Sequence, residues 1–243
     1  LNFNKYNFVQ KVFSILFFRS AAIFKLSNLI YFDSNCTEQL YALQTKEHLL
    51  CRLTRNYKYN KEIIKFPKKC EIYFSSKELK GFSKKYDNLP KNYYLILSEV
   101  TNHMHTKNWG FENMQNLVNQ MPEINWVQVG TLRERELINV KSDLRGKTNL
   151  RELFYIVRNC EAIVCTEGMY VHLSSAFDKK CFTILSGALP VELSLYPNIY
   201  PITKNPQVSC ANCWLDNCPF FNNPKCLSEV SVKQVRCKIK ELM

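Results

Sequence analysis

The chain has 243 residues, of which 46% are hydrophobic and 22% are charged. This composition excludes a disordered chain, and the length allows one large domain or two modest ones. The 33 Lys and Arg residues outnumber the 21 Asp and Glu residues, giving a formal net charge of +12. That charge favours an anionic partner: nucleic acid, an anionic membrane surface or a phosphorylated substrate.

The 11 cysteines are an odd number in a chain that is too large for a small disulfide scaffold. Several lie in apolar runs and are typical of small buried side chains: Cys51, Cys160, Cys165 and Cys181. The sequence therefore favours a reducing, cytoplasmic setting.

No apolar run is long enough to span a bilayer. Residues 8–30 come closest, but Lys11, Arg19 and Lys25 interrupt them. This stretch predicts one or two amphipathic helices, either packed as core or lying on a membrane surface.

Residues 1–88 are weakly patterned and are expected to form a first region. Residues 37–55 have a helical pattern that contains His48, and a basic, Tyr-rich stretch follows at 56–69. A polar loop ending near Pro90 predicts a domain boundary, with a second domain at 89–243.

The second region alternates between strand and helix patterns. Short apolar runs predict strands at 93–98, 125–129, 162–165 and 181–185. Helices are expected at 111–121, at 132–140, after Asn149, after Gly168 and after Ser231. Asn149 with Glu152 and Ser231 with Gln234 have the spacing of capping boxes. Repeated strand–helix units predict an α/β fold with a doubly wound parallel sheet.

A turn between strand and helix at residues 159–176 (NCEAIVCTEGMYVHLSSA) is the first candidate site. In open α/β sheets, strand carboxyl ends and helix N-termini meet at such turns, where free N–H groups attract anions. Glu167, Gly168 and His172 lie where a phosphorylated ligand is expected. The alternative is a polar turn with a solvated carboxylate and a histidine used for packing.

Two further polar loops follow predicted strands. In the loop at 99–109, Lys107 is well placed as a point charge for a phosphate. Residues 130–136 (GTLRERE) follow the next strand, and an acidic residue there can accept hydrogen bonds from ribose hydroxyls, as in dinucleotide-binding sites. The alternatives are a solvated loop anchored by Trp109 and a charged helix start favoured by the macrodipole.

Four cysteines near the C-terminus have the spacing C-x2-C-x4-C-x7-C, at Cys210, Cys213, Cys218 and Cys226. Such a set suits a structural Zn or Fe site. Only one CxxC pair is present, so a cysteine-rich loop held by packing is the alternative. The sequence contains no P-loop, nucleophile elbow or HExxH motif, and the catalytic residues stay unassigned.

Taken in order, several motifs resemble glycosyltransferase family nine, the bacterial lipopolysaccharide heptosyltransferases. They are Lys107-Asn108-Trp109, the strand ending at Gly130, residues 144–153 (LRGKTNLREL), residues 167–176 (EGMYVHLSSA) and the cysteine set followed by residues 231–235. The motifs are loose individually, but their order is kept over residues 93–243.

The resemblance implies a GT-B architecture: a C-terminal Rossmann-like domain that holds the nucleotide-sugar, and an incomplete N-terminal α/β domain on the acceptor side. It implies a glycosyltransferase that needs no cofactor, an ADP-heptose-like donor, and an anionic glycolipid acceptor such as the lipopolysaccharide core. It also implies a position at the inner face of the cytoplasmic membrane. Carried over to this chain, the expected donor-binding residues are His103, Thr106, Lys107, Gly130, Glu134, Glu136, Glu167, Gly168, Met169 and His172.

Within that set, Lys107 is expected to contact the diphosphate, and either Glu134 or Glu136 the nucleoside. The sequence departs from the family pattern where Glu167 replaces an Asp and Met169 replaces a Gly. His103 and His105 stand in place of a pair of small residues. In the family, the carboxylate that acts as the base lies on a Gly-rich loop of the N-terminal domain. Residues 1–88 contain no stretch that resembles this loop.

Three functions follow from these patterns. The first is sugar transfer, and the second is nucleotide-sugar binding without transfer. The third is a nucleic-acid-binding module with a cysteine-bound metal. The last is disfavoured because the basic residues are dispersed and do not cluster on one face.

Overall fold

The fold was analysed in a computed structural model that describes residues 71–99, 105–188, 191–194, 196–204, 213, 215–219 and 224–243. These residues belong to one compact unit, Lys69–Met243. The helices expected at 8–30 and 37–55, with His48, lie outside the described residues, as do His103 and Cys210. The domain boundary near residue 88 stays a prediction.

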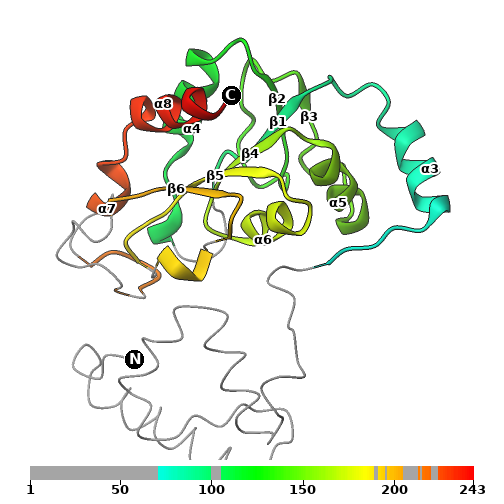
Figure 1. The fold of residues 1–243 in the computed structure, drawn as a ribbon. Coiled ribbons are helices and arrows are strands. Elements are labelled where there is room, and N and C mark those ends of the chain that lie inside the picture. Colours follow the sequence, from blue (N-terminus) through cyan, green and yellow to red (C-terminus); the bar gives the residue numbers. More distant parts are fainter. Residues whose placement is uncertain are drawn as a thin grey trace, which may run out of the picture. The chain divides into compact units, whose positions relative to one another are not determined.

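The core of the unit is a six-stranded, wholly parallel sheet (Figure 1). Its strands are β1 (Tyr93–Ile96), β2 (Asn125–Gln128), β3 (Ser142–Asp143), β4 (Ala162–Thr166), β5 (Lys180–Ile184) and β6 (Ile199–Ile202). Their order in the sheet is β3-β2-β1-β4-β5-β6, so the direction of winding reverses between β1 and β4. The predicted doubly wound α/β fold is confirmed.

Helices cover both faces of the sheet (Figure 1). They are α3 (Ser76–Lys85), α4 (Phe111–Gln120), α5 (Leu150–Asn159), α6 (Met169–Ala176), α7 (Lys225–Ser228) and α8 (Val232–Leu242), with 3-10 turns η3 (His105–Lys107) and η4 (Val191–Ser194). None of the helices in this described part is long and apolar enough to cross a membrane.

Alternation along each strand divides the buried side chains into two cores. Tyr94 and Ile96 of β1 pack on the face covered by α4 and α8, while Tyr93 and Leu95 pack on the face covered by α5 and α6. Burial on both faces explains why β1 and β4 are short, mostly apolar runs.

Local sequence signals account for several helix starts. Asn149 with Glu152 at α5 and Ser231 with Gln234 at α8 form the predicted capping boxes. A third box, Ser75 with Glu78, begins α3, a helix that is not among those predicted although its capping pattern is present in the sequence. Helix α3 has no buried residue; Phe82 on its inner side packs against Tyr155 of α5, with ring centroids 5.5 Å apart.

The helix predicted at 132–140 is wrong, because residues 131–141 form a loop without a helix. The charges at 133–136 resemble a helix start in sequence, but the buried side chains of Gln128 and Arg145 bind carbonyls of this loop. Side chains from other elements thus satisfy backbone groups that a helix would satisfy internally.

Candidate functional site

The predicted site residues lie at the carboxyl edge of the sheet, around the position where the strand order reverses. β1 and β4 are adjacent, with Tyr94 opposite Ala162 and Ile96 opposite Val164. The turn η3 follows β1 in the chain, and α6 follows β4. Open α/β sheets bind ligands outside the strand ends at this topological switch point.

Lys107 and Glu167 meet there from opposite sides of the switch point. Lys107 Nζ lies 3.8 Å from Glu167 Oε2, and the two side chains are only 16% and 9% exposed. Ser194 of η4 donates a hydrogen bond to Glu167 Oε1 at 3.1 Å. Burial raises the pKa of the Glu167 carboxyl, and Lys107 and Ser194 oppose the rise. The long ion pair therefore compensates the buried carboxylate only in part.

The first turn of α6 begins beside this pair. Gly168 is its N-cap and offers no side chain to the first N–H groups. A Cβ at Gly168 would meet nothing within 4 Å, so open space adjoins the turn. Met169, the next residue, is 43% exposed. An uncapped helix N-terminus facing open space favours an anion, because its N–H groups and dipole are positive.

His172 lies one turn further along α6 and has a partner on another segment. Its Nδ1 is 2.8 Å from the hydroxyl of Tyr196, and the two rings are perpendicular with centroids 5.8 Å apart. Tyr196 is 8% exposed. The pair fixes the plane of the imidazole near the N-terminal half of α6.

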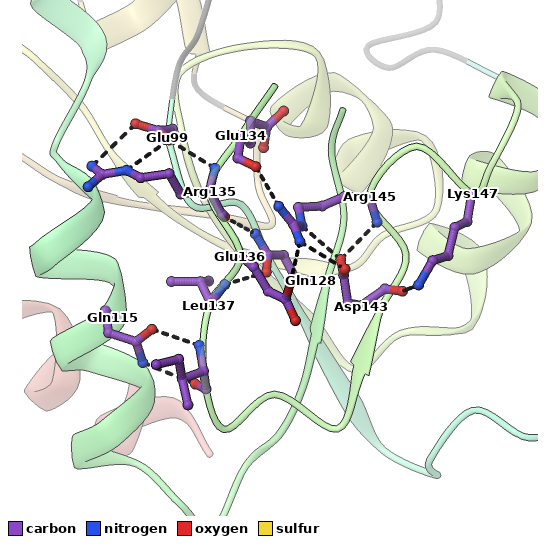
Figure 2. A network of polar contacts seen from close by, with 11 residues as sticks. Glu99, Gln115, Gln128, Glu134, Arg135, Glu136, Leu137, Asp143, Arg145 and Lys147 are labelled. Atoms are coloured by element: carbon purple, nitrogen blue, oxygen red, sulfur yellow. Dashed lines mark hydrogen bonds and ion pairs between the residues drawn. The ribbon is translucent and has the colours of Figure 1, made fainter. Parts of the chain in front are cut away.

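Glu134 comes from the loop after β2, which is held by a network of side chains (Figure 2). Its Oε1 accepts a hydrogen bond from the Thr131 N–H at 2.9 Å, and its carbonyl accepts one from Arg145. Burial raises the pKa of this carboxyl, the Thr131 N–H lowers it and the charge of Glu99 raises it further. The charge of Glu134 in turn adds to the effect of burial in raising the pKa of the Tyr170 hydroxyl, whose residue belongs to the first turn of α6.

The second oxygen of Glu134 has no hydrogen-bond partner among the residues that the structure describes. Within that same part of the chain, Oε2 is buried without a hydrogen bond, and so is Oγ of Ser98, just beyond β1. Glu134 is 7% exposed and Ser98 is fully buried. Buried polar atoms are nearly always paired, so the Glu134 oxygen at the carboxyl edge is a candidate acceptor for a bound ligand.

Glu136 differs from Glu134 in its surroundings. Its side chain is 69% exposed and forms an ion pair with Arg145, with Nη2 3.1 Å from Oε2. Gly130, at the end of β2, supports Glu134: its φ is +139°, and a Cβ would overlap the Glu134 carboxyl group. The structure thus gives Glu134, rather than Glu136, the buried position at the edge of the sheet.

Thr106 has structural partners in the fold. It is 2% exposed, and its hydroxyl donates to the carbonyl of Leu215 at 2.7 Å. Direct contact between Thr106 and a ligand, expected from the sequence, stays a prediction.

The cysteine set is only partly described. Cys213 and Cys218 are partly exposed and Cys226 is buried. The described cysteine, histidine and acidic side chains include no group of three or more that could hold a metal ion. The described cysteines therefore do not fit a metal by themselves, and the Zn or Fe site stays a prediction.

Several residues of the site were not found from sequence. They are Ser98, Gln128, Arg145, Ser194 and Tyr196. Ser98 lies at the end of the predicted strand 93–98. Ser194 and Tyr196 bond to residues 27 and 24 positions away, and Gln128 and Arg145 to loop carbonyls 7 and 11 positions away. A polar residue within an apolar strand, as at Gln128, is the one signal that sequence offered.

Comparison with known proteins identifies the family to which the chain is similar. Residues 45–222 match the sequence model of glycosyltransferase family 9 (heptosyltransferase). Among curated proteins, none matches the chain in sequence.

Solved structures match the fold at low identity. Escherichia coli ADP-heptose lps heptosyltransferase II matches with a TM-score of 0.53 and 14% identity, covering 76% of this chain and 58% of its own. The E. coli heptosyltransferase WaaC with ADP-2-deoxy-2-fluoro heptose matches with a TM-score of 0.51 and 17% identity, covering 81% and 55%. The dodecameric iron-containing heptosyltransferase TibC of enterotoxigenic E. coli, in complex with ADP-D-beta-D-heptose, matches with a TM-score of 0.51 and 16% identity, covering 63% and 45%. This chain therefore spans less than two thirds of the length of each of these structures.

Proposed function

The chain belongs to glycosyltransferase family 9, the heptosyltransferase family, and we propose that its C-terminal unit binds a nucleotide-diphosphate sugar for glycosyl transfer. The observation that carries this proposal is the partly compensated Lys107–Glu167 pair beside the uncapped N-terminus of α6, at the switch point of the sheet. A diphosphate entering there would gain the Lys107 ammonium and the helix N–H groups.

We assign the nucleoside to Glu134 rather than Glu136. The unpartnered Glu134 Oε2 is a buried acceptor at the end of β2, where ribose hydroxyls can donate to a carboxylate. The Glu136 side chain is mostly exposed and already paired with Arg145. Glu167, Gly168, Met169 and His172 would then line the diphosphate and the sugar, with His103, Gly130 and Thr106 around the nucleotide.

In the proposed reaction, an acceptor hydroxyl oxygen forms a bond to the anomeric carbon of the donor sugar. The bond from that carbon to the diphosphate oxygen breaks, and its electron pair leaves with the nucleoside diphosphate. Positive groups at Lys107 and the α6 N-terminus would stabilise the departing charge. The proton of the hydroxyl passes to a general base, a role that we assign to none of the described residues.

The donor is proposed to be ADP-heptose-like, because the related structures are described with ADP-heptose or named for it. The acceptor is proposed to be an anionic glycolipid such as a lipopolysaccharide core, reached at the inner face of the cytoplasmic membrane. The net charge of +12 supports attraction to such a surface.

Calorimetric titration with ADP, UDP and GDP tests the binding step. We expect ADP to bind, and Lys107→Met to weaken ADP about 10- to 100-fold, as for loss of a charge-assisted contact to phosphate. The matched control is Lys233→Met, the same charge change on the exposed side of α8, which should leave ADP affinity unchanged. A folded wild-type protein that binds none of the three nucleotides would exclude the proposal.

A second function, donor binding without transfer, is separated from the first by turnover. The assay is release of ADP from ADP-heptose in the presence of a lipopolysaccharide-core acceptor. Binding of ADP with no acceptor-dependent release supports the second function, and acceptor-dependent release supports the first.

A further inference from the structure

The turn that carries Lys107 is held by a segment more than 100 residues further along the chain. The N–H of Thr106 donates to the carbonyl of Asp216 at 3.1 Å, and the Thr106 hydroxyl donates to the carbonyl of Leu215 at 2.7 Å. Thr106 is 2% exposed, so water competes little for these bonds. Two residues after the turn, the Trp109 ring N–H donates to the Val230 carbonyl at 2.8 Å.

The holding segment, residues 215–219, is part of the cysteine-rich stretch. Cys213 precedes it and Cys218 lies within it. Leu215 is 39% exposed and Asp216 is also exposed, so burial in the core does not explain where their backbone lies. Their two carbonyls instead accept the hydrogen bonds of Thr106.

We propose that the 215–219 segment positions Lys107 for the donor diphosphate, with Thr106 as the positioning residue between them. Lys107 follows Thr106 directly, so the two Thr106 bonds fix the backbone from which the ammonium group extends. Because that backbone is already fixed, less conformational entropy is lost when the Lys107 ammonium group binds an anion. The cysteine-rich stretch thereby serves the donor site through its backbone carbonyls.

This inference rests on the proposed function, but its test has a readout that does not depend on a ligand. Hydrogen–deuterium exchange is measured over residues 105–109, with β4 (Ala162–Thr166) as an internal reference for the fold, and ADP affinity is measured in parallel. Thr106→Val removes the hydroxyl donor at nearly constant volume, and Thr106→Ser keeps it. In Thr106→Val we expect faster exchange over 105–109, unchanged exchange in β4, and ADP affinity lowered about five- to tenfold, as for one buried hydrogen bond. Thr106→Ser should restore both values to nearly those of the wild type.

A second variant changes the segment that accepts the hydrogen bonds and leaves the buried Thr106 intact. Asp216→Gly loosens the exposed 215–219 segment, and it should raise exchange over 105–109 and lower ADP affinity by less than Thr106→Val does. Unchanged exchange in both variants would overturn the inference, and so would faster exchange with unchanged ADP affinity. If the wild type binds no ADP, the proposed function fails, while the exchange data still decide whether the segment holds the turn.

Discussion

The two halves of the candidate site are built in opposite ways. On the side of β2, the loop at 131–141 is held by hydrogen bonds between its backbone and the side chains of Gln115, Gln128 and Arg145 (Figure 2). On the side of β4, the facing charges Lys107 and Glu167 are 3.8 Å apart, beyond ordinary hydrogen-bonding distance.

The difference indicates that the two halves have different roles in ligand binding. The proposed nucleoside half has its geometry fixed before a ligand arrives, so little ordering is required when the ligand binds. The proposed diphosphate half has a loose ion pair in which a phosphate oxygen can replace Glu167 as the partner of Lys107. Variants on the β2 side should therefore change stability most, and variants on the β4 side should change affinity and pH dependence.

The largest effect is expected at Gln128, which is fully buried. Its side chain donates to the Arg135 carbonyl and accepts from the Leu137 N–H, both at 2.8 Å. Gln128→Ala leaves both backbone groups without partners and should lower the free energy of unfolding by about 2–4 kcal/mol. Urea denaturation monitored by tryptophan fluorescence measures this loss.

The control for Gln128 is Gln115, which makes the same two kinds of bond to Ile138 at 2.7 and 3.0 Å in an exposed setting. Water can replace those bonds, so Gln115→Ala should cost less than about 1 kcal/mol. Equal losses in the two variants would show that burial does not distinguish the two ends of the loop.

The next effect is expected at Gly130. Its φ of +139° disfavours other residues, and a Cβ would overlap the Glu134 carboxyl group. Gly130→Ala should lower the free energy of unfolding by about 1–3 kcal/mol and displace Glu134 from its buried position. In contrast, Gly81→Ala in α3 meets nothing within 4 Å and should stabilise slightly.

A double-mutant cycle separates the two causes at Gly130. In a Glu134→Ala background the overlap is absent and only the backbone strain remains, so Gly130→Ala should cost less there than in the wild type. An unchanged cost would assign the whole effect to backbone conformation and remove the support that Gly130 gives to Glu134.

Local signals in the sequence were sufficient for much of the fold. Buried strands β1 and β4 are apolar runs, and the capping boxes at Asn149 and Ser231 satisfy N–H groups within four residues. Strands β3 and β6 were missed: β3 has two polar residues, and β6, at the other edge of the sheet, contains Pro201, which disfavours a strand assignment.

The site was predictable only in part, for a related reason. Lys107, Glu134 and Glu167 each follow a predicted strand, so their place at one edge follows from the parallel fold. What surrounds them comes from distant segments: Ser194 lies 27 residues after Glu167, and Leu215 lies 109 residues after Thr106. Contacts at such separations leave no periodic pattern. The predicted helix at 132–140 is a loop for a similar reason, because side chains 7 to 23 residues away bond to its backbone.

A smaller effect is expected at Glu167, on the pH dependence of the free energy of unfolding. Burial raises the pKa of its carboxyl above the ordinary value of 4.5. The native state then holds its proton more tightly than the unfolded state, so stability falls as the pH rises from about 4.5 through the native pKa. Glu167→Gln removes this dependence and should gain stability relative to the wild type over that window, as measured by urea denaturation at several pH values. Glu134 also has a raised pKa but is present in both proteins, so the difference isolates Glu167.

The same variant tests whether a ligand phosphate replaces Glu167 as the partner of Lys107. Without the competing carboxylate, Lys107 should accept a phosphate more readily, and ADP affinity should rise about two- to fivefold at pH values where the Glu167 carboxyl of the wild type is ionised. A loss of ADP affinity would instead indicate that Glu167 contacts the nucleotide directly or positions Lys107.

The smallest effect is expected at Tyr196, whose hydroxyl lies 2.8 Å from His172 Nδ1. If that hydroxyl donates, the imidazole proton resides on Nε2, the ring nitrogen able to donate to an anion. Tyr196→Phe keeps the ring contact and removes this constraint, so the 15N chemical shifts of His172 should change toward a mixture of the two tautomers. Stability should change by less than about 1 kcal/mol, and Tyr200→Phe, whose ring stacks on Phe182, is the control that should leave the His172 spectrum unchanged. An unaltered spectrum in Tyr196→Phe would mean that the fold of α6 alone orients the imidazole, which would place His172 with the pre-formed half of the site.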